Sequence, residues 1–342
     1  MDTSKGNKRI DSVDILRAVG IMIMVMGHVG FGGVFDRYIH SFHMPVFFLI
    51  SGYLFTSKAD VGVGTQILKR AKRLLIPYIF YAIVNYIFWI LLPHTKEWFV
   101  PLLRVMTYNT EDLPICGALW FLTAMFFAEA YYIFLDRIIK KETVRSILVV
   151  TIAVVASFLQ NITDFRLPLT IDTAVVCMGF LELGRVLRRV DKCSLLTKIK
   201  ERKLIWAFIA VVLLGINAIL SFVNEYVNIK SGWYGFIPLF WVNALIGSAA
   251  YLMFSIWFDM IVSDSNAIRK ALVNIGQKSM IFLGLNQLVI KLLSMGYEAT
   301  GLTQNIYVRG AVIFIAAAVI LYIIALSVGR IKSKSIKKLF GI

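Results

Sequence analysis

Residues 13–31, VDILRAVGIMIMVMGHVGF, form an apolar run interrupted by only three ionisable side chains, Asp14, Arg17 and His28. One helix needs about 20 mostly apolar residues to cross roughly 30 Å of hydrocarbon, so the run predicts a membrane-spanning helix. At about 100° per residue, the spacing places all three side chains on one helix face, with Arg17 and His28 about 16 Å apart along the axis. Polar groups inside a membrane are costly unless they face protein or water, so this face is a candidate site.

Similar apolar stretches recur along the chain. Of the 342 residues, 59% are hydrophobic and 16% charged, whereas soluble domains are roughly half apolar. This composition, with a mean hydropathy of +0.77, excludes a soluble globular enzyme. We expect an all-α integral membrane protein with about ten transmembrane helices in one bundle. The further stretches are 43–56, 74–92, 117–135, 146–160, 171–187, 204–224, 235–258, 275–295 and 309–329. A short one, such as 43–56, could instead be re-entrant.

The basic residues predict the orientation. Of the 36 Lys and Arg residues, 28 fall on the side of the N-terminus in a ten-helix arrangement and 7 on the other side, with Arg17 inside the first helix. Cytoplasmic loops carry the excess of Lys and Arg, so both termini of a multi-pass membrane protein are expected in the cytoplasm. We expect one membrane domain over 1–342, with tails at 1–10 and 330–342, the latter basic. The net charge of +16 is then explained by basic residues in the cytoplasmic loops, which set the orientation of the protein in the membrane. Nucleic-acid binding is not expected.

The cysteines do not indicate a disulfide framework or a metal site. Cys116, Cys177 and Cys193 are odd in number and lack C-x-x-C spacing. They are expected to be small apolar residues of the core, and no metal is expected.

His28 is the strongest catalytic candidate of the first helix. No carboxylate follows it on that helix, so it must find a partner on another helix or in a cavity. A neutral imidazole can take a proton from a hydroxyl near neutral pH. The alternative is a buried structural histidine, which only forms hydrogen bonds between helices and takes no part in catalysis. Asp14 and Arg17, three residues apart, can simply pair with each other.

The next segments add a small-residue motif and a basic cluster. In the stretch HMPVFFLISGY, His43 precedes a proline, and Ser51 is followed by Gly52, small residues that allow close packing, most simply against the first helix. The sequence KRAKR at 69–73 lies before the third expected helix. It is either an inside-positive anchor or a guanidinium clamp for phosphates.

Three segments together resemble the acyltransferase-3 family of membrane acyltransferases. They are Asp14-Ile-Leu-Arg17-Ala-Val-Gly followed by His28 after ten intervening residues, the segment SFHMPVFFLISGY at 41–53, and Arg70-Ala-Lys-Arg73. The His-Met-Pro variant is similar to the branch of fucose 4-O-acetylases and polysaccharide O-acetylases. Less specific pieces follow at 120–122, 170–184 and 275–279, so the resemblance covers nearly the whole chain.

The resemblance implies an enzyme that transfers an acyl group, usually acetyl, from cytoplasmic acyl-CoA to a hydroxyl of a glycan at a bacterial inner membrane. Acetyl-CoA would be a donor substrate, and no cofactor would be bound permanently. The residues that match the family's catalytic pair are Arg17 and His28, with Asp14 beside them. Arg70 and Arg73, flanked by Lys69 and Lys72, would meet the CoA phosphates.

Other residues are candidates for substrate binding. His43, Ser51 and Tyr53 lie in the second stretch, and Ser51 or Tyr53 could stabilise an oxyanion, with helix packing as the alternative. Trp120 could stack on a sugar or anchor the interface. Glu129 lacks a local partner and is expected to contact Arg17 or an arginine near the cytoplasmic mouth, whereas Glu182 is expected to pair with Arg185.

Two further expectations concern the acceptor side of the site. Many family members carry a histidine near the position of Asn286, so a mechanism that needs a second imidazole there is in doubt. The outer binding loop is expected at 93–116 or 225–235.

Two mechanisms and a rival function stay open. His28 could activate the acceptor hydroxyl directly or form an acetyl-histidine intermediate. A transporter or flippase of a polar or lipid-linked substrate could use the same polar face, although the inverted repeats typical of transporters are absent. An oligomer is compatible with either function.

Overall fold

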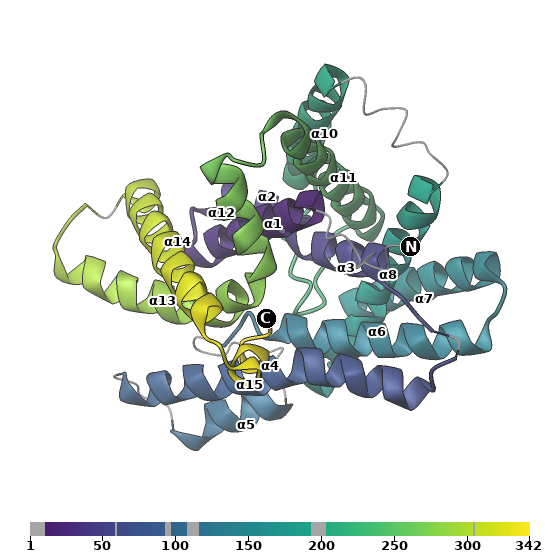
Figure 1. The fold of residues 1–342 in the computed structure, drawn as a ribbon, viewed down its shortest axis with the longest axis horizontal. Coiled ribbons are helices and arrows are strands. Elements are labelled where there is room, and N and C mark those ends of the chain that lie inside the picture. Colours follow the sequence, from purple (N-terminus) through teal and green to yellow (C-terminus); the bar gives the residue numbers. More distant parts are fainter. Residues whose placement is uncertain (1–10, 59, 93–96, 108–115, 193–202, 304) are drawn as a thin grey trace, which may run out of the picture.

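The computed structural model describes residues 11–58, 60–92, 97–107, 116–192, 203–303 and 305–342 (Figure 1). These residues form α-helices, one 3₁₀ turn at Pro168–Thr170 and an isolated bridge between Asn228 and Trp233. The all-α fold is therefore confirmed for this part of the chain. The expected tail 1–10 and Cys193 lie outside the described residues.

Each of the ten predicted stretches contains a helix. The matching helices are α1 (Asp11–Val29), α3 (His43–Leu54), α4 (Val63–Leu91), α6 (Trp120–Ile138), α7 (Glu142–Ile162), α8 (Ile171–Lys192), α10 (Lys203–Val223), α11 (Ile237–Ile261), α13 (Ser279–Ala299) and α14 (Ile306–Arg330). Seven of these, all except α3, α6 and α8, are long and apolar enough to cross a membrane. The chain is thus a multi-pass membrane protein, while a total of ten spans and the placement of the termini stay predictions.

Two predicted boundaries were wrong. Helix α4 begins at Val63, so the basic cluster 69–73 lies inside the helix and not before it. Its 29 residues extend about 43 Å, longer than the hydrocarbon core, and Lys and Arg are good helix formers. The expected helix 275–295 is divided, because Lys278 leaves helical geometry (φ −115°, ψ 22°) and ends α12 (Ala267–Gln277) before α13 starts.

Three more short helices connect the long ones. They are α2 (Gly33–His40), α5 (Phe99–Thr107) and α15 (Lys334–Leu339). Their short length and charged residues explain why a search for long apolar stretches missed them. Helices α2, α12 and α15 contribute to the cavities or their surroundings, as described below.

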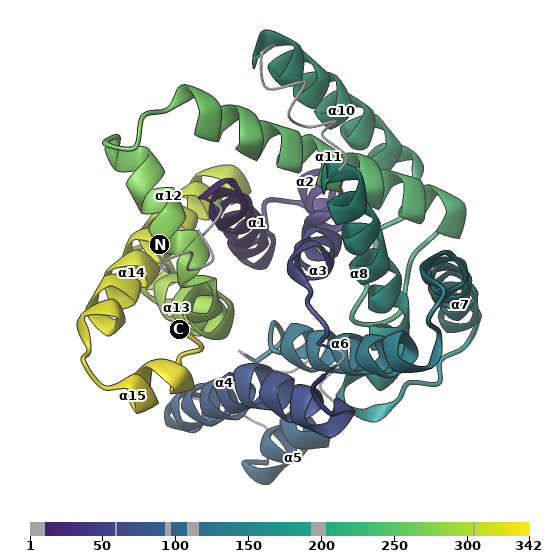
Figure 2. The same ribbon diagram turned by 45° about the vertical axis from the view of Figure 1, so that its right-hand side comes forward.

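Helices α1 and α3 stand near the centre of the ring of helices seen in Figure 2. A Cβ atom on Gly276 would lie 1.8 Å from the carbonyl oxygen of Asp14, so the backbones of α12 and α1 touch. Likewise, a Cβ atom on Gly52 would lie 1.8 Å from the carbonyl oxygen of Leu181. Gly52 thus allows α3 to pack closely against α8, and not against the first helix as expected.

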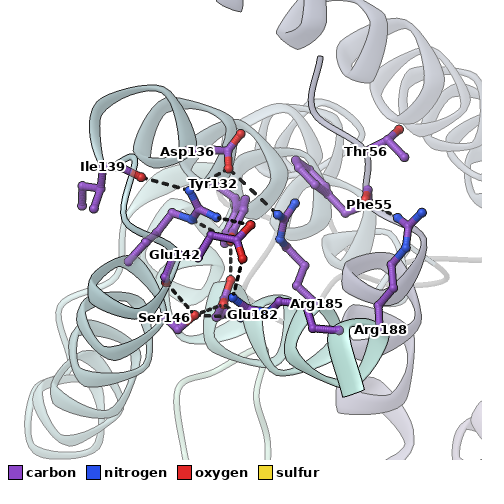
Figure 3. Close-up of polar contacts among 12 residues, drawn as sticks. Phe55, Thr56, Tyr132, Asp136, Ile139, Glu142, Ser146, Glu182, Arg185 and Arg188 are labelled. Atoms are coloured by element: carbon purple, nitrogen blue, oxygen red, sulfur yellow. Dashed lines mark hydrogen bonds and ion pairs between the residues drawn. The ribbon is translucent and has the colours of Figure 1, made fainter. Parts of the chain in front are cut away.

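A buried polar network joins α6, α7 and α8 (Figure 3). Glu182 is fully buried, pairs with Arg189 at 2.8 Å and accepts hydrogen bonds from Tyr132 and Ser146. The predicted partner Arg185 lies instead 4.0 Å from Asp136 on α6. Residues seven apart return to nearly the same helix face, so a partner two turns away competes with one three residues away.

Candidate functional site

Two cavities lie beside the middle of α1. The first, which we call the basic cavity, has a volume of about 560 Å³. Its charged lining residues come from α1, α4, α15 and the α12–α13 junction, and they are Arg17, Arg70, Arg73, Lys278 and Lys337. The remaining walls are mostly apolar, so the cavity suits a ligand with an anionic part and a narrow, less polar part.

Carboxylates position the arginines of the basic cavity. On α1, Arg17 Nη1 lies 3.2 Å from Asp14 Oδ1, the predicted local pair, and Asp14 is buried. On α4, Arg73 Nη2 lies 2.6 Å from Oε1 of Glu129, and Arg70 Nε lies 3.4 Å from Oε2. The expectation that Glu129 contacts an arginine of the basic cluster is therefore met by both Arg70 and Arg73.

Ser51 belongs to the same group of side chains. Its hydroxyl donates to Oε1 of Glu129 at 2.7 Å, and Ser51 also lines the basic cavity. The hydroxyl proton is therefore held by Glu129 and is not directed at a substrate atom. Glu129 lies behind Ser51 and the two arginines without lining the cavity itself.

The second cavity, which we call the histidine cavity, has a volume of about 490 Å³. Its polar lining includes His28 on α1, His40 on α2, His43 and Trp120 at the starts of α3 and α6, and Gln287 on α13. The predicted residues His28, His43 and Trp120 thus come together in one space. Gln287 and His40 were missed by the sequence analysis, although each is a polar residue among apolar ones.

His28 has one hydrogen-bond partner on another helix. Its Nδ1 lies 3.2 Å from Nε2 of Gln287. Asn286, which the sequence analysis singled out, lines neither cavity, and its side-chain nitrogen donates to Phe282 and Leu283 on its own helix. One residue along a helix rotates the side chain by about 100°, which separates these two roles.

The other two histidines are oriented by backbone oxygens. His40 Nδ1 lies 2.8 Å from the carbonyl oxygen of Asp36, and His43 Nδ1 lies 2.8 Å from that of Ile39. A carbonyl only accepts, so Nδ1 carries the proton in each ring and Nε2 is left as the acceptor. Burial lowers the pKa of His40 below the ordinary value, which favours the neutral ring. Among the described residues, no group of three or more His, Cys, Asp or Glu is arranged to hold a metal.

The two cavities meet at three apolar side chains. Met24, Met44 and Leu283 line both of them, and we call this set the shared wall. Met24 lies between Arg17 and His28 on α1, so one helix presents its arginine to one cavity and its histidine to the other. The polar face predicted from the spacing is thus divided between two chambers.

A hairpin closes part of the histidine cavity. Residues 226–230 line it, within one of the two loops predicted for this role. Arg166 donates to the carbonyl oxygen of Ser231 at 2.8 Å, and the Tyr234 amide donates to Asn161 at 3.0 Å, which holds the hairpin to the end of α7. In the other predicted loop, 93–116, residues 93–96 and 108–115 lie outside the described residues, and the described remainder, which includes α5, does not line the histidine cavity.

The remaining predicted residues lie elsewhere. Lys69 and Lys72 line a third space of about 540 Å³ together with Arg73 and Lys338, which we call the side pocket. It borders the basic cavity, because Arg73 lines both. Tyr53 lines none of the three spaces and packs with the apolar cluster of α1 and α3. The cysteines Cys116 and Cys177 are buried and not bonded in a disulfide.

Comparison with known proteins identifies the family. Searches of curated proteins and of solved structures found no significant match. A family model described as an acyltransferase domain matches residues 10–329, nearly the whole chain. This range contains every residue of the histidine cavity and of the shared wall, and the described geometry therefore belongs to a chain of the acyltransferase-3 family.

Proposed function

We propose that this membrane acyltransferase transfers an acetyl group from cytoplasmic acetyl-CoA to a hydroxyl of a cell-envelope or exported glycan, with His28 as general base. The observation that carries the proposal is the meeting of two chemically different cavities at the shared wall. One cavity is basic and suits an anionic donor. The other contains histidines and Trp120, which suit a hydroxyl-bearing acceptor.

The donor would enter the basic cavity from the cytoplasm. Its phosphates would stay at the cationic mouth, while the uncharged pantetheine arm extends along the apolar wall towards Met24 and Met44. Glu129 holds Arg70 and Arg73 at fixed positions, so their orientation does not depend on the ligand. Pre-oriented groups lose less entropy on binding.

In the reaction, the ring nitrogen of His28 that does not face Gln287 removes the proton of the acceptor hydroxyl. The hydroxyl oxygen attacks the thioester carbonyl and forms the new ester bond. The carbon–sulfur bond then breaks, and the CoA thiolate leaves with the proton that His28 accepted. The products are the O-acetyl glycan and free CoA, and His28 is returned neutral.

Gln287 supports this role by selecting the tautomer of His28. An amide can present its oxygen or its nitrogen to Nδ1, and the oxygen accepts a proton from Nδ1–H. That arrangement leaves the lone pair of Nε2 available as the base. The structure places Nε2 of Gln287 at 3.2 Å from Nδ1, so this role requires the amide to be turned by 180°, which directs Oε1, buried and without a hydrogen-bond partner as placed, at Nδ1–H.

An acetyl-His28 intermediate is the competing chemical route. It requires the imidazole to attack the thioester before the acceptor binds, so acetyl transfer to the protein would occur without acceptor. A brief incubation with radiolabelled acetyl-CoA distinguishes the two, because only this route labels the protein in a manner that His28→Ala abolishes.

The test is binding and turnover of acetyl-CoA by detergent-purified protein. We expect His28→Ala to keep donor binding and to lose thioester cleavage. We expect the triple variant Arg70→Gln, Arg73→Gln and Glu129→Gln, which avoids leaving a buried carboxylate unpaired, to lose donor binding. If the intact wild type binds no acyl-CoA, the enzyme proposal fails and transport of a polar or lipid-linked substrate becomes the better explanation.

A further inference from the structure

The C-terminal segment lies across the mouth of the basic cavity. Helix α15 and residues 340–342 pack between α4 and α13 (Figure 2). The hydroxyl of Tyr81 donates to the carbonyl oxygen of Phe340 at 3.1 Å, and the Phe340 ring contacts Phe80 with centroids 4.8 Å apart. Gly341, at φ 75°, turns the chain beside Met280. These contacts hold the segment in place as part of the cavity wall.

This segment brings two lysines to the mouth. Lys337 lines the basic cavity and Lys338 lines the side pocket. Lys278, at the junction of α12 and α13, faces the same space as Lys337. Lys69 and Lys72 approach from α4 on the side of the side pocket.

The protein offers these lysines little negative charge. No Asp or Glu side chain of the described residues lines the basic cavity or the side pocket, and the five lysines there face one carboxylate, that of Ile342. The buried carboxylates nearby, Asp14 and Glu129, are already paired with arginines. Burial and the charge of Lys337 lower the pKa of Lys278, which is the response of an ammonium group placed beside another without a counter-ion.

We propose that residues 337–342 and Lys278 complete a site for the phosphate groups of the soluble acyl donor. Lysines from α4, the α12–α13 junction and α15 surround one opening, and their excess of positive charge suits a diphosphate or phosphate monoester. Arg70 and Arg73, by contrast, share the charge of Glu129 and act deeper in the cavity. The inference rests on the proposed function for the identity of the donor.

The family match covers part of this site and not all of it. The matched domain ends at residue 329, and α15 begins at Lys334, where the Ser333 side chain accepts from the Ile336 amide. Residues 334–342 therefore lie outside the matched range, whereas Lys278 lies inside it.

The experiment compares two charge-matched double variants of the full-length protein in neutral detergent. Lys337→Ala with Lys338→Ala removes the two lining lysines. Lys332→Ala with Lys334→Ala removes two exposed lysines of the same segment that line neither space. Binding of CoA is measured by calorimetry at low and high salt, and turnover is measured with acetyl-CoA and with S-acetylpantetheine, which lacks the nucleotide phosphates.

We expect the first variant to bind CoA about tenfold more weakly, equivalent to about 1.4 kcal/mol, and with a weaker dependence on salt. Its turnover of S-acetylpantetheine should equal that of wild type, because the acetyl-transfer chemistry is unchanged. The second variant should match wild type in every measurement. Equal CoA binding by all three proteins overturns the proposal and leaves the lysines as contacts to anionic lipid.

Two other outcomes separate this inference from the proposed function. Tighter CoA binding by the first variant would show that the segment obstructs the mouth, which contradicts the proposal. If wild type binds pyrophosphate, used as a second probe, through Lys337 and Lys338 but cleaves no thioester, the phosphate site stands and the acetyltransferase proposal fails.

Discussion

Replacing Glu129 with Gln tests the charge arrangement beneath the basic cavity. Glu129 is fully buried on α6, and its carboxylate is shared by Arg73 at 2.6 and 2.7 Å, Arg70 at 3.4 Å and the Ser51 hydroxyl at 2.7 Å. Glutamine keeps the shape of the side chain but removes its charge. It also places an NH₂ donor towards one of the groups that now donate to the carboxylate.

The expected cost follows from these contacts. Removing one member of a buried ion pair costs about 3–5 kcal/mol, because the other charge stays buried without a partner. Here the Arg73 side chain is 49% exposed and keeps much of its hydration, whereas that of Arg70 is only 15% exposed. We therefore expect Glu129→Gln to lower the free energy of unfolding by about 2–3 kcal/mol, below the range for a fully buried pair.

The assay is reversible unfolding in mixed micelles with increasing SDS, followed by circular dichroism. The matched control is Glu142→Gln, a carboxylate that is 57% exposed and pairs with Arg189, for which the loss should stay below about 0.5 kcal/mol. Adding Arg70→Gln and Arg73→Gln to Glu129→Gln should recover part of the loss, since no unpaired charge remains. If Glu129→Gln is as stable as Glu142→Gln, the carboxylate does not hold the arginines in solution and the reasoning is refuted.

Three further predictions concern the cavities and the close helix contacts. Gln287→Met removes the partner of His28 and should lower turnover about tenfold at unchanged CoA affinity, as measured by steady-state kinetics and calorimetry. Met44→Trp enlarges a side chain of the shared wall and should lower acetyl transfer at least about tenfold while CoA still binds, because the thioester can no longer reach the base. Gly276→Ala forces α12 away from the α1 backbone and should cost about 1–3 kcal/mol in SDS unfolding, whereas Gly215→Ala, with open space around it, should cost none.

The long apolar stretches predicted the helices well, because hydrophobic length is a local property of the sequence. Spacing within α1 likewise placed Asp14, Arg17 and His28 on one face, and the local pair of the first two is observed. These inferences need only the geometry of one helix. The division of the helix at Lys278 and the early start of α4 were not predicted, because neither interrupts the apolar or helix-forming pattern of the sequence.

Contacts between helices could not be predicted in the same way. Gly52 was expected against α1, yet it allows α3 to approach α8, and Glu182 selects Arg189 over the nearer Arg185. A small residue or a buried charge in the sequence indicates that a partner exists, but it does not indicate which helix supplies that partner. The neighbours Asn286 and Gln287 could not be told apart for the same reason. The rotation of α13 about its axis decides which of them contacts His28, and the structure shows that it is Gln287.

In the proposed reaction, the shared wall would let a soluble donor and an acceptor from the outer side react without opening a path for water across the bilayer. Met24, Met44 and Leu283 line both cavities, so in the described part of the chain three apolar side chains stand between a charged chamber and a polar one. Methionine is unbranched and flexible, and two of the three wall residues can change rotamer to admit a thin pantetheine arm. In the proposed reaction, the arm itself then fills the opening that it makes, and the thioester meets His28 while bulk water stays excluded from both sides of the bond.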